Sequence, residues 1–582
     1  MNFQQRIIRL IRQSIEWLPD RYFAHRHPGP FFFQLIRLFA PIIQHLTPND
    51  KWSLGAHLPF WLKALSARPI GPRPNSKRIF IFSAYRTQIT HDLMLAIFLA
   101  WRGHKITFGY LPKLQSPIKE PIIDHPSAKP YLKAVFKNIE KLSDGKIKCV
   151  DLSDISVNEY FIDEKMLYDQ VLSDTIMCIR CETVDRNDPE IEKIWNYYQT
   201  QARYAHALAR TYLSQNTKEF DLVLVGNGTT FETAHFCQAA RELNIPVNTF
   251  EKFDFRCKRV INHGDHFLAF EDINDVWKQR EKLGYNAEIF RSFAVKRAKD
   301  LLNERKRGAT DNWGWSLQKS PDQALKEGLD EAGVGDGRKF VLLCTNVPYD
   351  AGYSFLLGLF PSMKDWLIST VQYLLENTDI HVVVRAHPGE ADGLRAKERS
   401  EHILAEYIGH ERLTVIPGSQ STNTYNLIEA CHFGIVFAST TGVEMAILGK
   451  VAVVGSTVYY GRRGFTVDSD SIEAFLQNVK RLADIDVIPR IDEEQCREAA
   501  VFHFIFYLVM LWPYPYHKPT EIRDQAIPRL ITTDSIKTYI PFFDAISLSK
   551  EEWGLRIGEF LTPNGKNHVP VPEAIMNNKG LT

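Results

Sequence analysis

The chain has 582 residues, of which 45% are hydrophobic and 24% are charged, and 70 Lys and Arg side chains balance 69 Asp and Glu. These fractions are those of an ordinary globular protein, so they exclude a disordered or fibrous class. A formal net charge of +1 gives no overall basic field, and we expect no nucleic-acid partner. Eight cysteines without dense spacing indicate a reducing compartment, so we expect a cytoplasmic protein.

The N-terminal region, residues 1–75, is aromatic, basic and predicted to be helical. Arg6, Arg9 and Arg12 interrupt its first apolar positions, which excludes a secretory signal. The apolar stretch 31–46 is shorter than the about 20 residues that a membrane span needs. We expect these helices to pack on the protein's own core or to lie on an anionic membrane surface, as a peripheral contact at the inner face of the plasma membrane.

Beyond residue 75, predicted strands and helices alternate in two series. The first series, 76–262, and the second, 338–495, are each typical of a parallel α/β domain. We therefore expect an α/β fold with two doubly wound Rossmann-like domains, a helical segment between them at 263–337, and a helical C-terminal tail at 496–582. The predicted strands are 78–86, 106–111 and 220–228 in the first domain and 339–346, 380–388, 433–438 and 451–455 in the second.

Polar residues follow four predicted strands of the second domain. Ligands of open parallel sheets bind beyond the carboxyl ends of the strands, so four such clusters on one edge indicate a binding site. The candidate residues are Asn346, Arg385, His387, Glu390, Ser439, Thr440, Thr441, Gly442, Glu444, Tyr460, Gly461, Arg462 and Arg463.

The cluster that follows the predicted strand 433–438 has two interpretations. Ser439, Thr440 and Gly442 place hydroxyls and free N–H groups at the start of a helix, which suits a phosphate. Glu444 lies one turn further, where its carboxylate can accept from ribose hydroxyls. Alternatively, Thr441 and Glu444 form a capping box, in which Glu444 only bonds the N–H of Thr441.

The clusters at the ends of the predicted strands 380–388 and 451–455 leave similar alternatives. His387 can hydrogen-bond a phosphate or leaving-group oxygen beside Arg385, or it can only cap neighbouring carbonyls at the strand exit that Pro388 fixes. Arg462 and Arg463 can neutralise a diphosphate or a sugar carboxylate, or they are solvated surface charges.

Two motifs carry a resemblance to a known family: RAHPGE at 385–390 and ASTTGVEMAILGKVAVVGSTVYYGRRGFT at 438–466. With them, the sequence over about 338–515 resembles the capsular polysaccharide biosynthesis family of bacterial glycosyltransferases, which includes the β-Kdo transferases of capsule assembly. The resemblance implies a GT-B fold, with the acceptor on the N-terminal lobe and the nucleotide-sugar on the C-terminal lobe. It also implies that His387 and Glu444 contact nucleotide or phosphate and that loop 460–463 approaches the donor.

The first domain matches this family only loosely. There, Asn227, Gly228 and Glu251 look like the acceptor-side interdomain face of the family. If the enzyme inverts the anomeric centre, a general base should come from this domain, and His91 and Asp92 are the best candidates. Asp92 can instead cap the helix that begins there, and the sequence leaves the stereochemistry open.

We expect no metal and no cofactor apart from the nucleotide-sugar substrate. Cys178 and Cys181 form a lone CxxC without the second ligand pair of a zinc site, and Asp468-Ser-Asp470 can be a plain helix cap. GT-B enzymes generally stabilise the leaving diphosphate with helix dipoles and basic residues.

The sequence thus predicts a glycosyltransferase that acts on a nucleotide-activated donor and a capsular polysaccharide or glycolipid acceptor. Three alternatives stay open. Two are enzymes, a teichoic-acid-type glycerophosphotransferase and a nucleotide-sugar 2-epimerase. The third is a non-catalytic component of capsule assembly or export.

Overall fold

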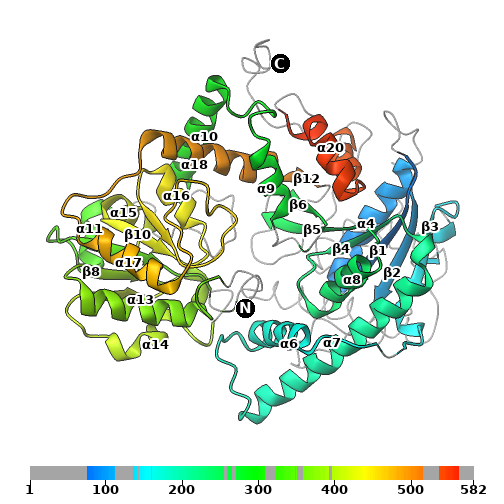
Figure 1. The fold of residues 1–582 in the computed structure, drawn as a ribbon, viewed down its shortest axis with the longest axis horizontal. Helices are drawn as coiled ribbons and strands as arrows, with labels where there is room; N and C mark the ends of the chain where they lie inside the picture. The colour runs from blue at the N-terminus through cyan, green and yellow to red at the C-terminus, as the bar shows by residue number, and fades with distance from the viewer. Residues whose placement is uncertain are drawn as a thin grey trace, which may run out of the picture. The chain divides into compact units, whose positions relative to one another are not determined.

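The computed structural model describes residues 75–84, 86–111, 136–137, 139–141, 143–158, 160–254, 258–264, 266, 270–308, 323–347, 349, 358–391, 396–514, 536–562 and 566. The helices expected near the N-terminus, in residues 1–74, lie outside this set. The chain forms two compact units, shown as ribbons in Figure 1. The first unit takes its described residues from 1–168, 196–272 and 512–560, and the second takes them from 169–195, 273–511 and 561–582.

The first unit is built on a seven-stranded sheet with the order β12-β6-β5-β4-β1-β2-β3. Strands β1 to β5 run parallel, while β6 lies antiparallel to β5 and β12 lies antiparallel to β6. The strands are β1 (Arg78–Ala84), β2 (Lys105–Leu111), β3 (Ile147–Asp151), β4 (Leu222–Gly226), β5 (Val247–Asp254), β6 (Lys258–His263) and β12 (Trp512–Pro513).

Helices pack on this sheet because its central strands are apolar on both faces; β1, for example, is buried at every residue after Arg78. Part of the expected C-terminal tail belongs here. In this part of the tail, Phe543 stacks on Phe98 at a centroid distance of 4.5 Å, and Asp544 pairs with Arg102 at 2.8 Å. The helices are α4 (Arg86–Arg102), α6 (Glu164–Ile179), α7 (Pro189–Gln215), α8 (Phe231–Glu242), α9 (Glu271–Lys278), α19 (Ile536–Ile546) and α20 (Lys550–Leu561), with parts of α6, α7 and α9 assigned to the second unit.

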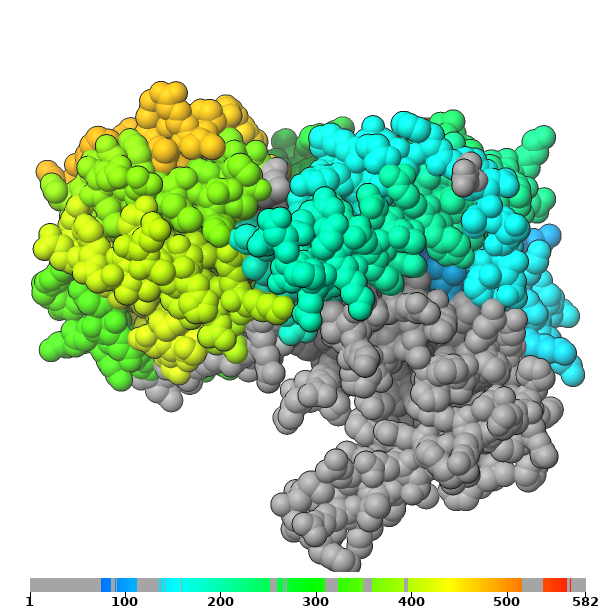
Figure 2. Space-filling model, turned by 90° about the horizontal axis from the view of Figure 1, so that it is seen from below, coloured from blue at the N-terminus to red at the C-terminus, as the bar shows by residue number. Residues whose placement is uncertain are grey.

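The second unit contains a five-stranded, fully parallel sheet with the order β11-β10-β7-β8-β9. In Figure 2, the residues of this unit coloured light green, yellow and orange lie next to one another on the left of the view. The strands are β7 (Phe340–Cys344), β8 (His381–Arg385), β9 (Leu413–Ile416), β10 (Phe433–Val436) and β11 (Ala452–Val454).

This strand order places the first strand of the unit in the middle, so the direction of winding reverses between β7 and β10. Helices α13 and α17 lie side by side on one face of the sheet, while α16 lies between the sheet and α18 (Figure 1). The helices are α10 (Glu288–Lys306), α11 (Leu325–Glu331), α13 (Met363–Asn377), α14 (Ser400–Ile403), α15 (Thr424–Ala430), α16 (Thr441–Ile447), α17 (Ile472–Ala483) and α18 (Glu493–Phe504). Both expected Rossmann-like domains are confirmed.

Candidate active site

The carboxyl ends of β7 and β10 meet at the winding reversal of the second sheet. Asn346 follows β7, and its Oδ1 accepts a hydrogen bond from the backbone N–H of Ala438, which follows β10, at 2.9 Å. This bond fixes the two strand ends to each other. Thr440 is exposed a few residues beyond, so hydroxyl and amide groups line the point where ligands of doubly wound sheets bind.

His387 lies half-buried at the end of β8 and has a fixed tautomer. Its Nδ1 accepts from the backbone N–H of Gly389 at 3.0 Å, so this nitrogen carries no proton. Burial, with a contribution from the charge of Arg385, lowers the pKa of His387 to about 4. The imidazole is therefore neutral at physiological pH and carries its proton on Nε2. His387 thus caps the amide N–H of Gly389 and not the neighbouring carbonyls that the capping interpretation names.

Arg385 and Glu390, both expected to bind the donor, are buried structural groups. The guanidinium of Arg385 donates to the carbonyl oxygens of Pro417 at 3.0 Å and Gln420 at 3.1 Å. The Glu390 carboxylate accepts from the hydroxyl of Ser400 at 2.7 Å and from its N–H at 2.9 Å. Internal partners thus satisfy both groups in this structure, and their expected contact with the donor stays a prediction.

Arg385→Met is expected to destabilise the fold by about 2–4 kcal/mol, because the carbonyls of the 417–422 loop lose their buried donors. The measurement is the free energy of unfolding in urea. Arg399→Met is the matched control, because Arg399 is partly exposed and lies 3.8 Å from Glu401. Equal effects in the two variants would contradict a structural role for Arg385.

The loop after β10 is held from below by Tyr460. This fully buried tyrosine donates to the carbonyl of Ser439. Gly442 is required there, since a Cβ atom on it would lie 2.3 Å from the Tyr460 hydroxyl oxygen. Tyr460 therefore supports the loop and is not positioned to touch a donor, contrary to expectation.

The capping box that the sequence allows is not formed. Helix α16 begins after Thr440, whose side chain makes no capping hydrogen bond, and the hydroxyl of Thr441 pairs with that of Ser439 at 2.9 Å. Glu444 is instead buried against α10 and α15. Its carboxylate forms an ion pair with Arg305 and accepts from the Tyr425 hydroxyl at 3.1 Å. Since both oxygens are engaged internally, the structure gives Glu444 a structural role in place of the expected contact with ribose.

Tyr507 is a member of this network that sequence reasoning missed. It lies in a π-helical turn, Ile505–Val509, that continues α18, and its hydroxyl lies 2.8 Å from that of Tyr459. It also bonds the side chain of Thr440, the exposed residue at the end of β10. Isolated π-turns frequently occur at functional sites, but an apolar stretch such as 501–512 carries no pattern that predicts one.

The two arginines of the 460–463 loop have different environments. Arg463 donates to Asn274 at 2.6 Å and lies over the ring of Phe502 at 4.6 Å. Burial and the nearby charge of Arg280 lower its pKa to about 10. These contacts give Arg463 internal partners, and its expected role as a diphosphate ligand stays a prediction. Arg462 is exposed and pairs with Asp470 at 2.6 Å.

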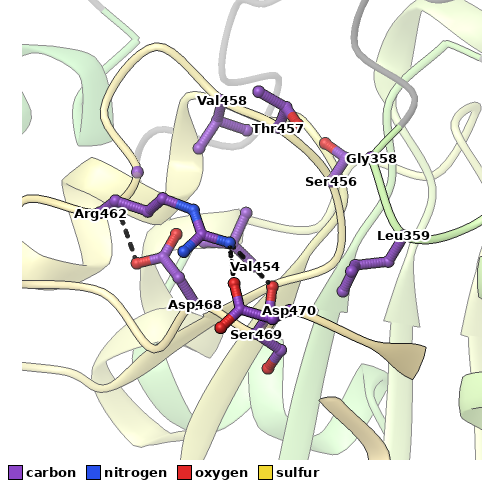
Figure 3. A pocket seen from close by; sticks show the side chains of 11 residues that line it. Gly358, Leu359, Val454, Ser456, Thr457, Val458, Arg462, Asp468, Ser469 and Asp470 are labelled. Carbon is purple, nitrogen blue, oxygen red and sulfur yellow. Dashed lines mark hydrogen bonds and ion pairs between the residues drawn. The ribbon is translucent and has the colours of Figure 1, made fainter. Parts of the chain in front are cut away.

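Arg462 and Gly461 line a pocket of about 260 Å³ at the end of β11. Figure 3 shows Arg462 with the two acidic residues of the pocket, Asp468 and Asp470, on one side and Ser456 on the other. Of the expected donor residues, the structure thus places Arg462 and Gly461 at a pocket and His387 and Asn346 at strand ends.

In the first unit, Asp92 lies inside α4, which begins at Arg86, so it does not cap that helix. It is buried and accepts from the Ser83 hydroxyl at 2.6 Å. Burial, aided by the charge of Glu251, raises its pKa to about 7, against the opposing effects of Ser83 and Arg259. A carboxylate poised near neutrality suits a general base. His91 also lies in α4, but its side chain is outside the described set.

The acceptor-side residues Asn227, Gly228 and Glu251 lie together at the ends of β4 and β5. Asn227 adopts a left-handed φ of 58°, and its Nδ2 donates to Glu251 Oε2 at 2.7 Å. Gly228 follows with a φ of 85° and packs so closely that a Cβ atom would lie 3.0 Å from the Thr249 methyl group. This tight turn lies at the carboxyl end of β4, and Glu251 is near enough to Asp92 for its charge to raise the pKa of that carboxyl.

Within the part of the chain that the structure describes, no group of three His, Cys, Asp or Glu side chains is arranged to hold a metal. Neither Cys178 nor Cys181 forms a disulfide bond. Of the helices in that same part, none combines the length and the apolar character that crossing a bilayer requires.

No family model and no curated protein sequence matches the chain. Solved structures similar to it include KpsC, the β-Kdo 2,4 transferase of Thermosulfurimonas dismutans, at 16% identity over 49% of this chain and 81% of that chain, with a TM-score of 0.33. A UDP-GlcNAc 2-epimerase of Methanocaldococcus jannaschii, in complex with UDP-GlcNAc and UDP, is 11% identical over 74% and 99%, with a TM-score of 0.23. The catalytic domain of starch synthase IV from Arabidopsis thaliana, bound to ADP and acarbose, is 11% identical over 74% and 95%, with a TM-score of 0.26.

Proposed function

We propose that the protein is a glycosyltransferase that moves a sugar from a nucleotide-activated donor to a capsular polysaccharide or glycolipid acceptor. The observation that carries the proposal is the winding reversal in the second sheet, with the neutral His387 one strand away. A parallel sheet with this topology binds nucleotides at such an edge, and the sequence motifs at the same strand ends resemble those of capsule glycosyltransferases.

The second unit would bind the nucleotide-sugar through uncharged N–H and O–H groups that donate hydrogen bonds. His387 offers Nε2–H, and the Ser439–Thr441 loop offers hydroxyls and amides. Neighbouring strands are about 4.8 Å apart, so the ends of β8 and β10 lie about 10 Å from each other across β7, a span that a nucleoside diphosphate can bridge. Such fixed N–H and O–H groups stabilise the negative charge that develops on a leaving diphosphate.

The first unit would supply the general base. In this proposal the acceptor hydroxyl loses its proton to Asp92 while its oxygen bonds to the anomeric carbon and the bond from that carbon to the diphosphate breaks. A single displacement of this kind inverts the anomeric centre. The pKa of Asp92, raised to about 7, allows it to accept a proton at physiological pH.

The acceptor and the location are proposed from the sequence. A basic, aromatic N-terminal region suits contact with the inner face of a membrane, where glycolipid acceptors are exposed. The sparse cysteines suit a reducing compartment.

The test is a thermal-shift and calorimetric panel of CMP, UDP, GDP and ADP, their sugar conjugates and CDP-glycerol. We expect one nucleotide to bind selectively and, at 100 times its dissociation constant, to stabilise the fold by about 2.7 kcal/mol. His387→Ala should weaken that binding about 10- to 100-fold, the effect of losing a hydrogen bond to a charged group. With its pKa lowered to about 4, His387 stays neutral and should contribute no change in binding between pH 6 and 8.

His402→Ala, at an exposed position of α14, is the matched control and should bind as wild type does. A selective response to CDP-glycerol would favour the glycerophosphotransferase, and conversion of a nucleotide-sugar without acceptor would favour the 2-epimerase. No binding by a well-folded sample would favour the non-catalytic component.

A further inference from the structure

The pocket at the end of β11 is too small for a whole nucleotide-sugar. Its walls come from the segment after β11, including Ser456 and Thr457, and from Gly358 and Leu359 before α13 (Figure 3). Its volume of about 260 Å³ lies below the roughly 300–1,000 Å³ of sites that enclose drug-sized ligands. A group of about the size of one monosaccharide fits this space.

The pocket opens on the same edge of the sheet as the proposed nucleotide site. Strand β11 is the neighbour of β10, and the Ser456 hydroxyl donates to the carbonyl of Phe437 at the end of β10, at 2.8 Å. With strands about 4.8 Å apart, the pocket lies about one strand spacing from the junction of β7 and β10. A nucleotide held at that junction can place its sugar in the pocket.

The pocket offers acceptors suited to sugar hydroxyls. Asp468 Oδ2 accepts from the Arg462 N–H at 3.0 Å and from the Thr466 hydroxyl at 2.7 Å, and Asp470 Oδ1 accepts from Arg462 Nη2 at 2.6 Å. The other oxygens, Asp468 Oδ1 and Asp470 Oδ2, take no hydrogen bond from any residue that the structure describes. None of the described residues that line it carries an aromatic ring on which a base could stack, so this part of the lining suits a sugar better than a base.

The charge of the pocket selects against an acidic sugar. Among the described residues that line it, Arg462, Asp468 and Asp470 are charged, which gives these residues together a net charge of −1. Arg462 is already bonded to Asp470 and to the carbonyl of Ser469, so a sugar carboxylate would have to displace an internal partner and face a second carboxylate. This differs from the sequence-based expectation that Arg462 receives a diphosphate or a sugar carboxylate.

We propose that this pocket holds the sugar of the donor and that it selects a neutral sugar over an acidic one. The inference rests on the proposed function for the identity of the ligand. It extends that function by naming the class of sugar, a neutral monosaccharide unit rich in hydroxyls.

The experiment compares conjugates that share a base and differ in one sugar group. Calorimetry would give dissociation constants for UDP-glucose against UDP-glucuronate and for GDP-mannose against GDP-mannuronate. For the base that binds, we expect the neutral conjugate to bind at least 10-fold more tightly than its acidic partner. Asp470→Asn should reduce this ratio several-fold. Asp484→Asn should not, because Asp484 is paired with Lys480 at the end of α17 and does not line the pocket.

Preference for the acidic conjugate, tight binding of a CMP-linked ulosonic acid, or an unchanged ratio in Asp470→Asn would overturn the pocket assignment. If free nucleotides bind while the sugar has no effect, the assignment fails and the proposed function stands. A second arm uses saturation-transfer NMR with glucose, N-acetylglucosamine and glucuronate at millimolar concentration. If no nucleotide binds but a neutral sugar gives a signal that is lost in Thr457→Trp, the sugar pocket is supported and the transferase function is rejected. If no sugar gives a signal either, both the pocket assignment and the transferase function are rejected.

Discussion

Asp92→Asn is expected to abolish sugar transfer and, at pH 8, to raise the free energy of unfolding. The turnover number should fall about 10²- to 10⁴-fold, as when a general base is removed. Stability should rise because the wild-type carboxylate is buried in the folded state and must ionise there, whereas an amide has no charge to bury. The pKa shift from 3.8 to about 7 sets the gain on the order of 1–4 kcal/mol.

The sign of the pH dependence follows from this raised pKa. Between pH 4 and pH 7 the folded state holds a proton on Asp92 that the unfolded state has released. The wild-type free energy of unfolding should therefore fall as the pH rises through this window, while that of Asp92→Asn should not. Turnover should show the opposite trend and increase as the pH rises through about 7, where Asp92 becomes able to accept a proton.

Urea unfolding from pH 4 to 9 and a pH–rate profile check both effects. Asp144→Asn makes the same chemical change at an exposed turn and should alter neither. Ser83→Ala removes a hydrogen bond that lowers the pKa of Asp92, so the rate profile should move to higher pH. Full activity in Asp92→Asn would place the base elsewhere. Lower stability at pH 8 would show that partners such as Arg259 outweigh the cost of burial.

The central strands of both sheets were predictable because their residues are apolar on both faces, as in β1, β7 and β8. The antiparallel edge of the first sheet, formed by β6 and β12, was not predictable. Strand β12 has two residues and pairs with β6 from about 250 positions away in the chain, which local periodicity cannot detect. For the same reason the sequence places α19 in a separate tail, although Phe543 of α19 stacks on Phe98 of α4 within the first unit.

The position of the candidate site was predictable, while the roles of its charged groups were not. A parallel sheet brings strand ends to one edge, so His387 and Asn346 were found from the order of the elements alone. Whether an arginine at such an end reaches a ligand or an internal carbonyl depends on loops distant in sequence. Arg385 bonds residues 417–422 and Arg463 bonds Asn274, and no local pattern indicates either pairing.

For Glu444, the family resemblance and the contacts in the structure lead to opposite expectations. The resemblance implies that Glu444→Ala abolishes transfer and leaves the fold intact. In the structure, the carboxylate neutralises Arg305, and the side chains of both residues are no more than 10% exposed. Helix α10, which carries Arg305, is also tied to α15 through Lys306 and Glu429 at 2.7 Å. Loss of Glu444 therefore leaves a buried positive charge at a helix junction.

Glu444→Gln and Arg305→Met are each expected to destabilise the second unit by about 3–5 kcal/mol, because each leaves one buried charge without its partner. The double variant should cost less than the two single losses together, with a coupling energy above about 1 kcal/mol in a urea double-mutant cycle. The exposed pair Lys480 and Asp484 is the matched control, and its coupling should be much weaker, because water screens the charges of an exposed i,i+4 helix pair. If Glu444→Gln instead unfolds as wild type does while nucleotide binding is lost, the carboxylate contacts the donor and the pair with Arg305 opens when donor binds. If Glu444→Gln loses nucleotide binding only to the extent that it loses folded protein, Glu444 supports the Ser439–Thr441 loop. Contact with the nucleotide-sugar then belongs to that loop and to His387.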